Sequence, residues 1–219
     1  MCRFYIAKGP VDLSRALRLA AKYDPYAPGE RKQHGDGWGY VAVLGRGYLY
    51  YRSEAPIWED PTPIPMGEVV LAHARAASPG EPLGVQHAHP YMAYTPDGRL
   101  IFLAHNGSVD KKAIAQQLGL DPAPYTDSHV LALYLAKHWD NPQAAVEKAL
   151  PYVKTALNIA VVELPGPKAY AYTYYKGEGE YYPLYLLRLG VGKAVASSTL
   201  LRHVDADATK LEKGTFLQL

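Results

Sequence analysis

The chain has a single cysteine, Cys2, so no disulfide can form within it and metal sites built from paired cysteines are excluded. Long apolar runs are also missing, since no stretch approaches the roughly 18 residues of a membrane-spanning helix. The first residues lack the pattern of a signal peptide. These absences lead us to expect a cytoplasmic protein.

An excess of charge of one sign is missing as well. The 23 lysines and arginines nearly balance the 21 aspartates and glutamates, which leaves a formal charge of +2. This balance argues against a chain that binds nucleic acid or an anionic membrane surface. No repeat or low-complexity linker divides the 219 residues, so we expect one domain over 1–219.

The apolar pattern predicts an α+β fold. Predicted strands come first and last, and most of the predicted helices lie together in the middle of the chain. This order favours a layered α+β domain over a doubly wound parallel sheet. Strands are predicted at 2–7, 38–44, 47–52, 68–74, 100–105, 158–164, 168–175, 183–189 and 193–197, and helices at 12–22, 109–118, 127–139 and 142–153.

Cys2 is the most informative residue for chemistry. A small side chain at position 2 permits removal of Met1, which would expose a free α-amino group beside the thiol. An α-amino group has a pKa of about 7.7–8.0, which suits a general base at neutral pH. A nucleophile and its base would then belong to one residue. The alternative is a small apolar side chain that opens a buried strand.

Four other residues have two interpretations each. Asn106 and Gly107 follow a predicted strand and precede a predicted helix, where they can form an oxyanion hole or an ordinary turn. Arg75, at a strand end, can bind a carboxylate or be solvated. Asp127, at a helix start, can pair with an ammonium group or cap the helix.

Other clusters favour structural interpretations. His87 and His89 would share a face of an extended chain, but the histidines show no further ligand spacing, so we expect neither a metal nor a cofactor. The glycine-rich segment 34–40 lacks the spacing of a phosphate-binding loop. The tyrosine-rich stretch 170–185 lacks interleaved basic residues, which favours strand packing over nucleic-acid binding.

Taken in order, five segments resemble the class II glutamine amidotransferases, which are N-terminal-nucleophile hydrolases. The likeness covers almost the whole chain, because Thr126-Asp127-Ser128 adds the acidic position, and 195–198 and 211–214 are similar to the closing strands. The five segments are Met1-Cys2 as the processed nucleophile, His34 to Tyr40 as the Gly-Trp-Gly strand entry, His73-Ala74-Arg75, His87-Ala88-His89-Pro90 and His105-Asn106-Gly107.

The resemblance implies a four-layer αββα sandwich with two stacked antiparallel sheets. It also implies that the Cys2 thiol attacks the side-chain amide of glutamine and that water hydrolyses the resulting γ-glutamyl thioester. Asn106 and the Gly107 N–H would hold the oxyanion.

For the substrate, the resemblance implies that Arg75 binds the glutamine carboxylate and Asp127 binds the α-ammonium, with Ser78 in the same substrate-binding set. The chain departs from the family at several of its positions. Many members have a bulky aromatic residue after the arginine and a threonine two positions further on, where this chain has Ala76 and Ser78. Ser198 stands where many members have aspartate. Ala76 and Ser78 predict a covering loop that is looser or of different shape.

Three functions follow as hypotheses. The first is a stand-alone amidotransferase chain that hydrolyses glutamine and passes ammonia to a separate synthase partner, with a homo-oligomer as a possible assembly. The second is a hydrolase of another γ-glutamyl amide or related small amide that uses the same Cys2 chemistry. The third is a non-catalytic scaffold in which Met1 is retained.

Overall fold

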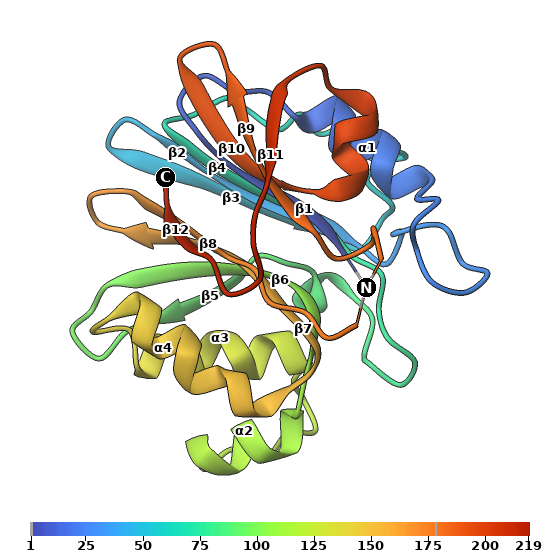
Figure 1. Cartoon of the computed structure of the whole chain (residues 1–219). Helices are drawn as coiled ribbons and strands as arrows, with labels where there is room; N and C mark the ends of the chain where they lie inside the picture. Colours follow the sequence, from blue (N-terminus) through green and yellow to red (C-terminus); the bar gives the residue numbers. More distant parts are fainter. Residues whose placement is uncertain (1, 178) are drawn as a thin grey trace.

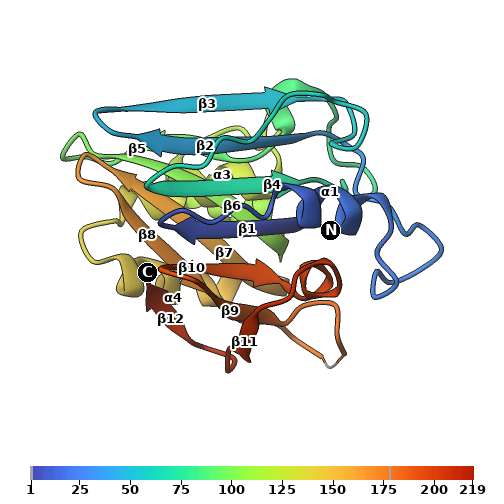
Figure 2. The same ribbon diagram turned by 90° about the horizontal axis from the view of Figure 1, so that it is seen from above.

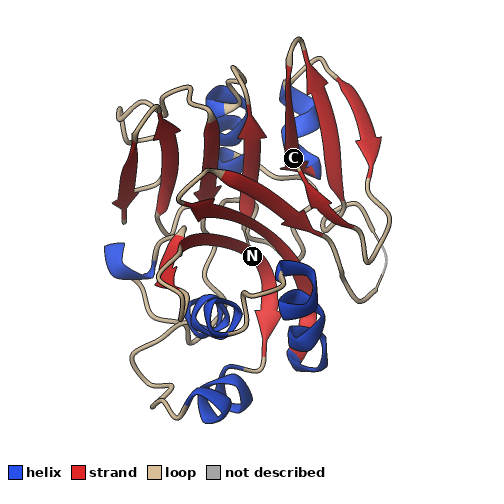
Figure 3. Cartoon of the chain, turned by 90° about the vertical axis from the view of Figure 1, so that its left-hand side faces the viewer, coloured by secondary structure: helices blue, strands red, loops and turns tan. Residues whose placement is uncertain are grey.

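Two antiparallel sheets are stacked face to face between two layers of helices (Figure 1). The computed structural model describes residues 2–177 and 179–219. In Figure 3 one group of helices lies below the strands, and the helices of the upper part are seen behind the strands. The expected four-layer αββα sandwich is confirmed.

The larger sheet brings the start and the end of the chain together. In the described residues it has seven strands in the order β11-β9-β10-β1-β4-β2-β3 (Figure 2). The first strand, β1, is therefore paired on both sides and carries the N-terminal segment into the interior of the sheet. The strands are β1 (Arg3–Lys8), β2 (Trp38–Leu44), β3 (Gly47–Ser53), β4 (Val69–Ala74), β9 (Leu184–Leu189), β10 (Gly192–Ser197) and β11 (Asp207–Lys210).

The smaller sheet has five strands among the described residues, in the order β12-β8-β7-β6-β5. Its two longest strands, β6 and β7, pair along most of their length. The strands are β5 (Tyr91–Tyr94), β6 (Leu100–Val109), β7 (Val153–Leu164), β8 (Lys168–Tyr172) and β12 (Phe216–Gln218).

Short helices cover the outer face of each sheet. The larger sheet is covered by α1 (Ser14–Lys22), which buries Ala16, Leu17, Ala20 and Ala21. The smaller sheet is covered by α2 (Lys111–Leu118), α3 (Asp127–Lys137) and α4 (Pro142–Ala149), each with a side-chain cap at its N-terminus. Turns of 3-10 helix lie at Val85–His87 (η1), Leu150–Tyr152 (η2) and Ser198–His203 (η3).

The alternation of side chains along β1 explains the layering. Phe4 and Ile6 point into the apolar core between the sheets, whereas Tyr5 and Ala7 point into the core under α1. Both faces of β1 are therefore apolar and buried, as a strand in the middle of a sandwich requires.

The structure also corrects several predictions. Residues 211–214, expected as a closing strand, form a turn between β11 and β12, since Gly214 has a φ of +88°. The helix expected over 142–153 ends at Ala149, because Pro151 cannot continue the hydrogen-bond ladder, and β7 begins at Val153. Strand β5, which has only four residues, was not predicted.

None of the helices formed by the described residues is long and apolar enough to cross a membrane.

Candidate active site

Cys2 lies at the start of β1, next to the middle of β6. Its backbone nitrogen donates a 3.1 Å hydrogen bond to Asn106 Oδ1, and its Sγ lies 3.9 Å from the Ala76 carbonyl oxygen. The side chain is 7% exposed. The sequence interpretation that Met1 is removed concerns a residue outside the described part of the chain. The fold therefore places the Cys2 nitrogen and the Asn106 amide side by side.

Asn106 and Gly107 lie inside β6, not between the end of a strand and the start of a helix as expected. Asn106 faces Asn158 of β7, and the register of the two strands shifts between Gly107 and Val109. Gly107 has a φ of +154°, and a Cβ on it would lie 2.0 Å from the Ala156 carbonyl oxygen. Only glycine fits this irregularity, which sets Asn106 beside Cys2.

The amide group of Asn106 is free to donate. Its side chain is fully buried, and Nδ2 has no hydrogen-bond partner among the described residues. Since Oδ1 accepts from the Cys2 nitrogen, Nδ2 is the donor that remains. An unpaired buried donor on the residue that contacts Cys2 is suited to an oxyanion hole before substrate arrives.

Asp127 begins α3 and is fixed by β6. Its Oδ2 accepts a 3.1 Å hydrogen bond from the Val109 N–H, and the side chain of Thr126 caps the same helix through the His129 N–H. Ser128 Oγ lies 3.1 Å from Asp127 Oδ1 and 2.9 Å from His105 Nδ1. Thr126, and not Asp127, therefore caps this helix. The Asp127 carboxylate is held at the cavity wall.

Arg75 lies just after β4 and is almost completely buried. Its backbone N–H donates to the Gly37 carbonyl at 2.8 Å, so the glycine-rich segment 34–40 borders the site. Its Nη1 donates to the Pro82 carbonyl at 2.9 Å. The guanidinium thus tethers the chain segment that follows it.

A small cavity joins these residues. Its volume is about 20 Å³, enough for about one water molecule and too small for a glutamyl group unless the covering segment 76–82 moves. Five of the six predicted site residues line this cavity. Asn106 does not line it, but its side chain accepts a hydrogen bond from the Cys2 nitrogen. The lining residues are Cys2, Arg75, Ala76, Ala77, Ser78, Glu81, His89, Gly107, Thr126, Asp127 and Ser128.

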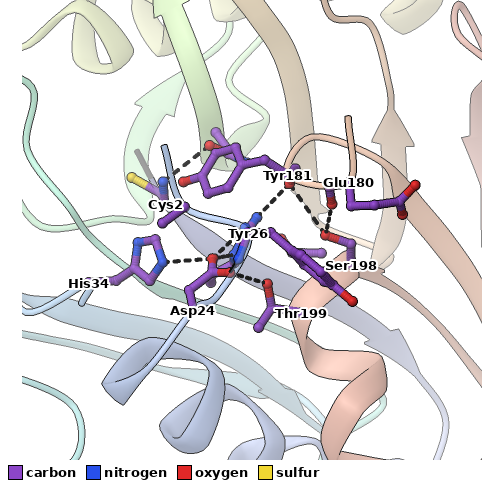
Figure 4. A network of polar contacts seen from close by, with 12 residues as sticks. Cys2, Asp24, Tyr26, His34, Glu180, Tyr181, Ser198 and Thr199 are labelled. Atoms are coloured by element: carbon purple, nitrogen blue, oxygen red, sulfur yellow. Dashed lines mark hydrogen bonds and ion pairs between the residues drawn. The ribbon is translucent and has the colours of Figure 1, made fainter. Parts of the chain in front are cut away.

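A buried ion-pair network supports Cys2 from the side of β1 (Figure 4). Arg3 and Asp24 are both fully buried and form an ion pair, and Asp24 also accepts hydrogen bonds from Thr199 at 2.7 Å and His34 at 3.0 Å. Burial acts to raise the pKa of Asp24, but the His34 hydrogen bond and the Arg3 charge prevail and lower it to about 2. Asp24 is therefore ionised at neutral pH.

Tyr181 connects this network to Cys2. The Arg3 guanidinium carbon lies 3.9 Å from the centre of the Tyr181 ring, and Arg3 Nη1 donates to the Tyr181 carbonyl at 2.8 Å. In Figure 4 the ring extends toward Cys2. Ser198 donates to the Glu180 carbonyl at 2.6 Å, so the residue that departs from the family pattern holds this segment in place.

The histidines of the sequence motifs are buried and packed together. The rings of His73 and His89 lie 3.9 Å apart, and His89 meets the edge of Tyr91 at 4.5 Å. Burial lowers the pKa of His73 and of His89 well below the ordinary value, so both are neutral. No group of three or more metal-binding side chains is gathered anywhere in the described chain.

No family model matches the chain. Gamma-glutamyl-hercynylcysteine sulfoxide hydrolase from two strains of Mycobacterium tuberculosis is 34% identical over 137 aligned residues, and the match covers 58% of this chain and 54% of that protein. The chain thus spans about half the length of the curated relatives it matches.

Solved structures share the fold. The glutamine PRPP amidotransferase of B. subtilis superposes with a TM-score of 0.68 and 17% identity. The match covers 99% of this chain and 47% of that protein. A glutamine aminotransferase class-II domain protein from Silicibacter pomeroyi matches 99% with 94% of its own, at a TM-score of 0.57 and 18% identity. The chain has the fold of class II glutamine amidotransferase domains. The resemblance expected from the motifs is confirmed at this level.

The sequence analysis did not identify the buried ion pair of Arg3 and Asp24, nor Glu81 in the cavity wall. Arg3 could have been found, because a charged residue inside an otherwise apolar strand needs a buried partner. Asp24 and Glu81 lie in loops with no distinctive pattern, and only the folded chain brings them to the cavity or to its supporting network.

Proposed function

We propose that this protein is an N-terminal-nucleophile amidohydrolase that cleaves γ-glutamyl amides with Cys2. One observation carries the proposal: the Cys2 nitrogen lies against Asn106, at a cavity that a buried arginine and an aspartate also line. The fold of class II glutamine amidotransferase domains and the hydrolase named among the curated relatives support the same chemistry.

The proposed mechanism begins with loss of Met1. The free α-amino group of Cys2 takes the thiol proton, and Sγ attacks the amide carbon of the substrate. Asn106 Nδ2 and the Gly107 N–H stabilise the negative oxygen of the tetrahedral intermediate. The protonated α-amino group then gives its proton to the leaving nitrogen, ammonia or an amine departs, and a γ-glutamyl thioester remains.

Water completes the proposed cycle. It adds to the thioester carbon with the α-amino group of Cys2 as base, the carbon–sulfur bond breaks, and glutamate leaves. The thiol regains its proton, so one amide bond and one water molecule are consumed in each turnover. Arg75 binds the α-carboxylate of the glutamyl group, Asp127 binds its α-ammonium, and Ser78 closes the same pocket.

Glutamine is the first candidate substrate, with ammonia passed to a separate synthase partner, and the single domain over 1–219 is part of this proposal. The second candidate is a γ-glutamyl amide with a larger amine. The name of the curated relatives favours it, as do the small residues Ala76, Ala77 and Ser78 in the covering segment. A cytoplasmic location stays a prediction.

The test is the intact mass of the natively expressed protein before and after exposure to 6-diazo-5-oxo-norleucine, a reactive glutamine analogue. We expect loss of Met1 and one adduct, mapped to Cys2, that Cys2→Ala abolishes. Hydrolysis of glutamine and of γ-glutamyl-4-nitroanilide then ranks the two candidates. A chain that keeps Met1 and hydrolyses neither compound would contradict the proposal and favour a non-catalytic scaffold.

A further inference from the structure

Glu81 belongs to the covering segment and reaches the same cavity as Cys2. A turn places it there: the Glu81 N–H donates to the Ser78 carbonyl at 3.1 Å, with Pro79 and Gly80 between them. Gly80 has a φ of +82°, so Pro79-Gly80 has the residue types and the backbone sign of a type II turn. The local sequence therefore fixes where the Glu81 side chain points.

The Glu81 carboxylate is incompletely neutralised. Its Oε1 lies 3.6 Å from Lys111 Nζ, while Oε2 is buried without a hydrogen-bond partner among the described residues. Lys111 also donates to the Tyr125 carbonyl at 3.1 Å, so it is not committed to Glu81 alone. A buried carboxylate oxygen with no partner has a cost that an incoming donor would remove.

Asp127 makes the surroundings of Glu81 more negative. Both carboxylates line the cavity, and burial together with the charge of Asp127 raises the pKa of Glu81 above its ordinary value. Arg75 and Lys111 are the cations that act in the opposite direction. The cavity thus has an arginine that can bind a carboxylate and two neighbouring carboxylates, and one oxygen of Glu81 has no hydrogen-bond partner among the described residues.

We propose that Glu81 is a substrate-binding residue that, together with Asp127, binds the α-ammonium of the γ-glutamyl group. This assignment rests on the function proposed above and adds to it a residue from the covering segment. Arg75 connects the two ends of the site, because it donates to the carbonyl of Pro82, the residue after Glu81. Closure of the segment over a zwitterionic substrate then brings opposite charges to both of its α-substituents.

The test compares substrates with and without the α-ammonium. These are glutamine against glutaramate, and γ-glutamyl-4-nitroanilide against glutaryl-4-nitroanilide, so the identity of the leaving amine does not decide the result. We expect Glu81→Gln to lower kcat/KM for the α-amino substrates about 10- to 100-fold, chiefly through KM, and to change it less than about 3-fold for the others. Glu212→Gln, an exposed carboxylate in the turn before β12, is the matched control.

A binding measurement accompanies the kinetics. The inhibition constant of L-glutamate should rise about 10- to 100-fold in Glu81→Gln, while that of glutarate should stay the same. Equal effects on both members of a pair, or none, would overturn the role of Glu81 while leaving the Cys2 chemistry standing. A wild-type protein that cleaves none of the four substrates and is not labelled at Cys2 would overturn the proposed function itself.

Discussion

Replacement of Arg3 by methionine tests how much the buried ion pair beside Cys2 stabilises the fold. Methionine keeps an unbranched stem in β1 but removes the cation, which leaves Asp24 ionised, fully buried and without its ion-pair partner. The Tyr181 carbonyl also loses its 2.8 Å donor. Removing one partner of a buried ion pair costs about 3–5 kcal/mol, so we expect Arg3→Met to lose unfolding free energy of that order at pH 7.

The contacts of Asp24 determine how the unfolding free energy changes with pH. Asp24 has a pKa of about 2 when folded and 3.8 ordinarily, so in the wild type it contributes stability above pH 3.8 that is lost as pH falls toward 2. That contribution is about 2 kcal/mol at neutral pH. Without Arg3 the pKa of Asp24 rises, and protonation at acid pH relieves the buried charge. The deficit of Arg3→Met should therefore be smaller at pH 4 than at pH 7.

The assay is guanidinium unfolding of wild type, Arg3→Met and Arg3→Met/Asp24→Asn at both pH values. The unfolding midpoints can be compared directly if the three proteins have equal m-values, the slopes of unfolding free energy against denaturant concentration. Because the double variant removes the orphaned charge, it should recover at least about 1 kcal/mol over the single variant at pH 7. A single variant that loses less than about 1 kcal/mol, or a double variant that is less stable still, would refute the reasoning.

Three further predictions concern the cavity. Asn106→Ala should lower kcat by about 10²- to 10³-fold with far-UV circular dichroism unchanged, and a kcat within a factor of three of wild type would exclude Asn106 from oxyanion binding. Gly107→Ala should lower the melting temperature by several degrees, because its Cβ would lie 2.0 Å from the Ala156 carbonyl oxygen; an unchanged melting curve would show that β6 and β7 separate freely. Asp127→Asn should raise KM for α-amino substrates about 10-fold or more, and KM values that match wild type would contradict its role.

The candidate nucleophile Cys2 and the residues near it were predictable because each belongs to a short motif. Cys2, Arg75 and the pair Asn106-Gly107 stand in segments whose order matches a known fold, and the structure brings them to one cavity or to its immediate edge. Their roles in catalysis and binding stay predictions until the kinetics are measured.

The local geometry was less predictable. Asn-Gly is a frequent turn dipeptide, and only the pairing of β6 with β7 shows that it lies inside a strand. Asp24 and Glu81 act through contacts that are distant in the sequence or that depend on how a loop folds over the cavity. A loop aspartate or glutamate is usually solvated, so nothing in the pattern distinguishes these two from the other carboxylates.

The burial of Cys2 has a consequence for measuring motion. The chain has one thiol, and the segment that carries Glu81 covers it, so an alkylating reagent can react only in molecules whose cover has opened. At low reagent concentration the alkylation rate reports the equilibrium population of open molecules. At high concentration it reaches a plateau equal to the opening rate itself. Because the chain has a single cysteine, alkylation of the unmodified protein measures how often and how fast the covering segment opens.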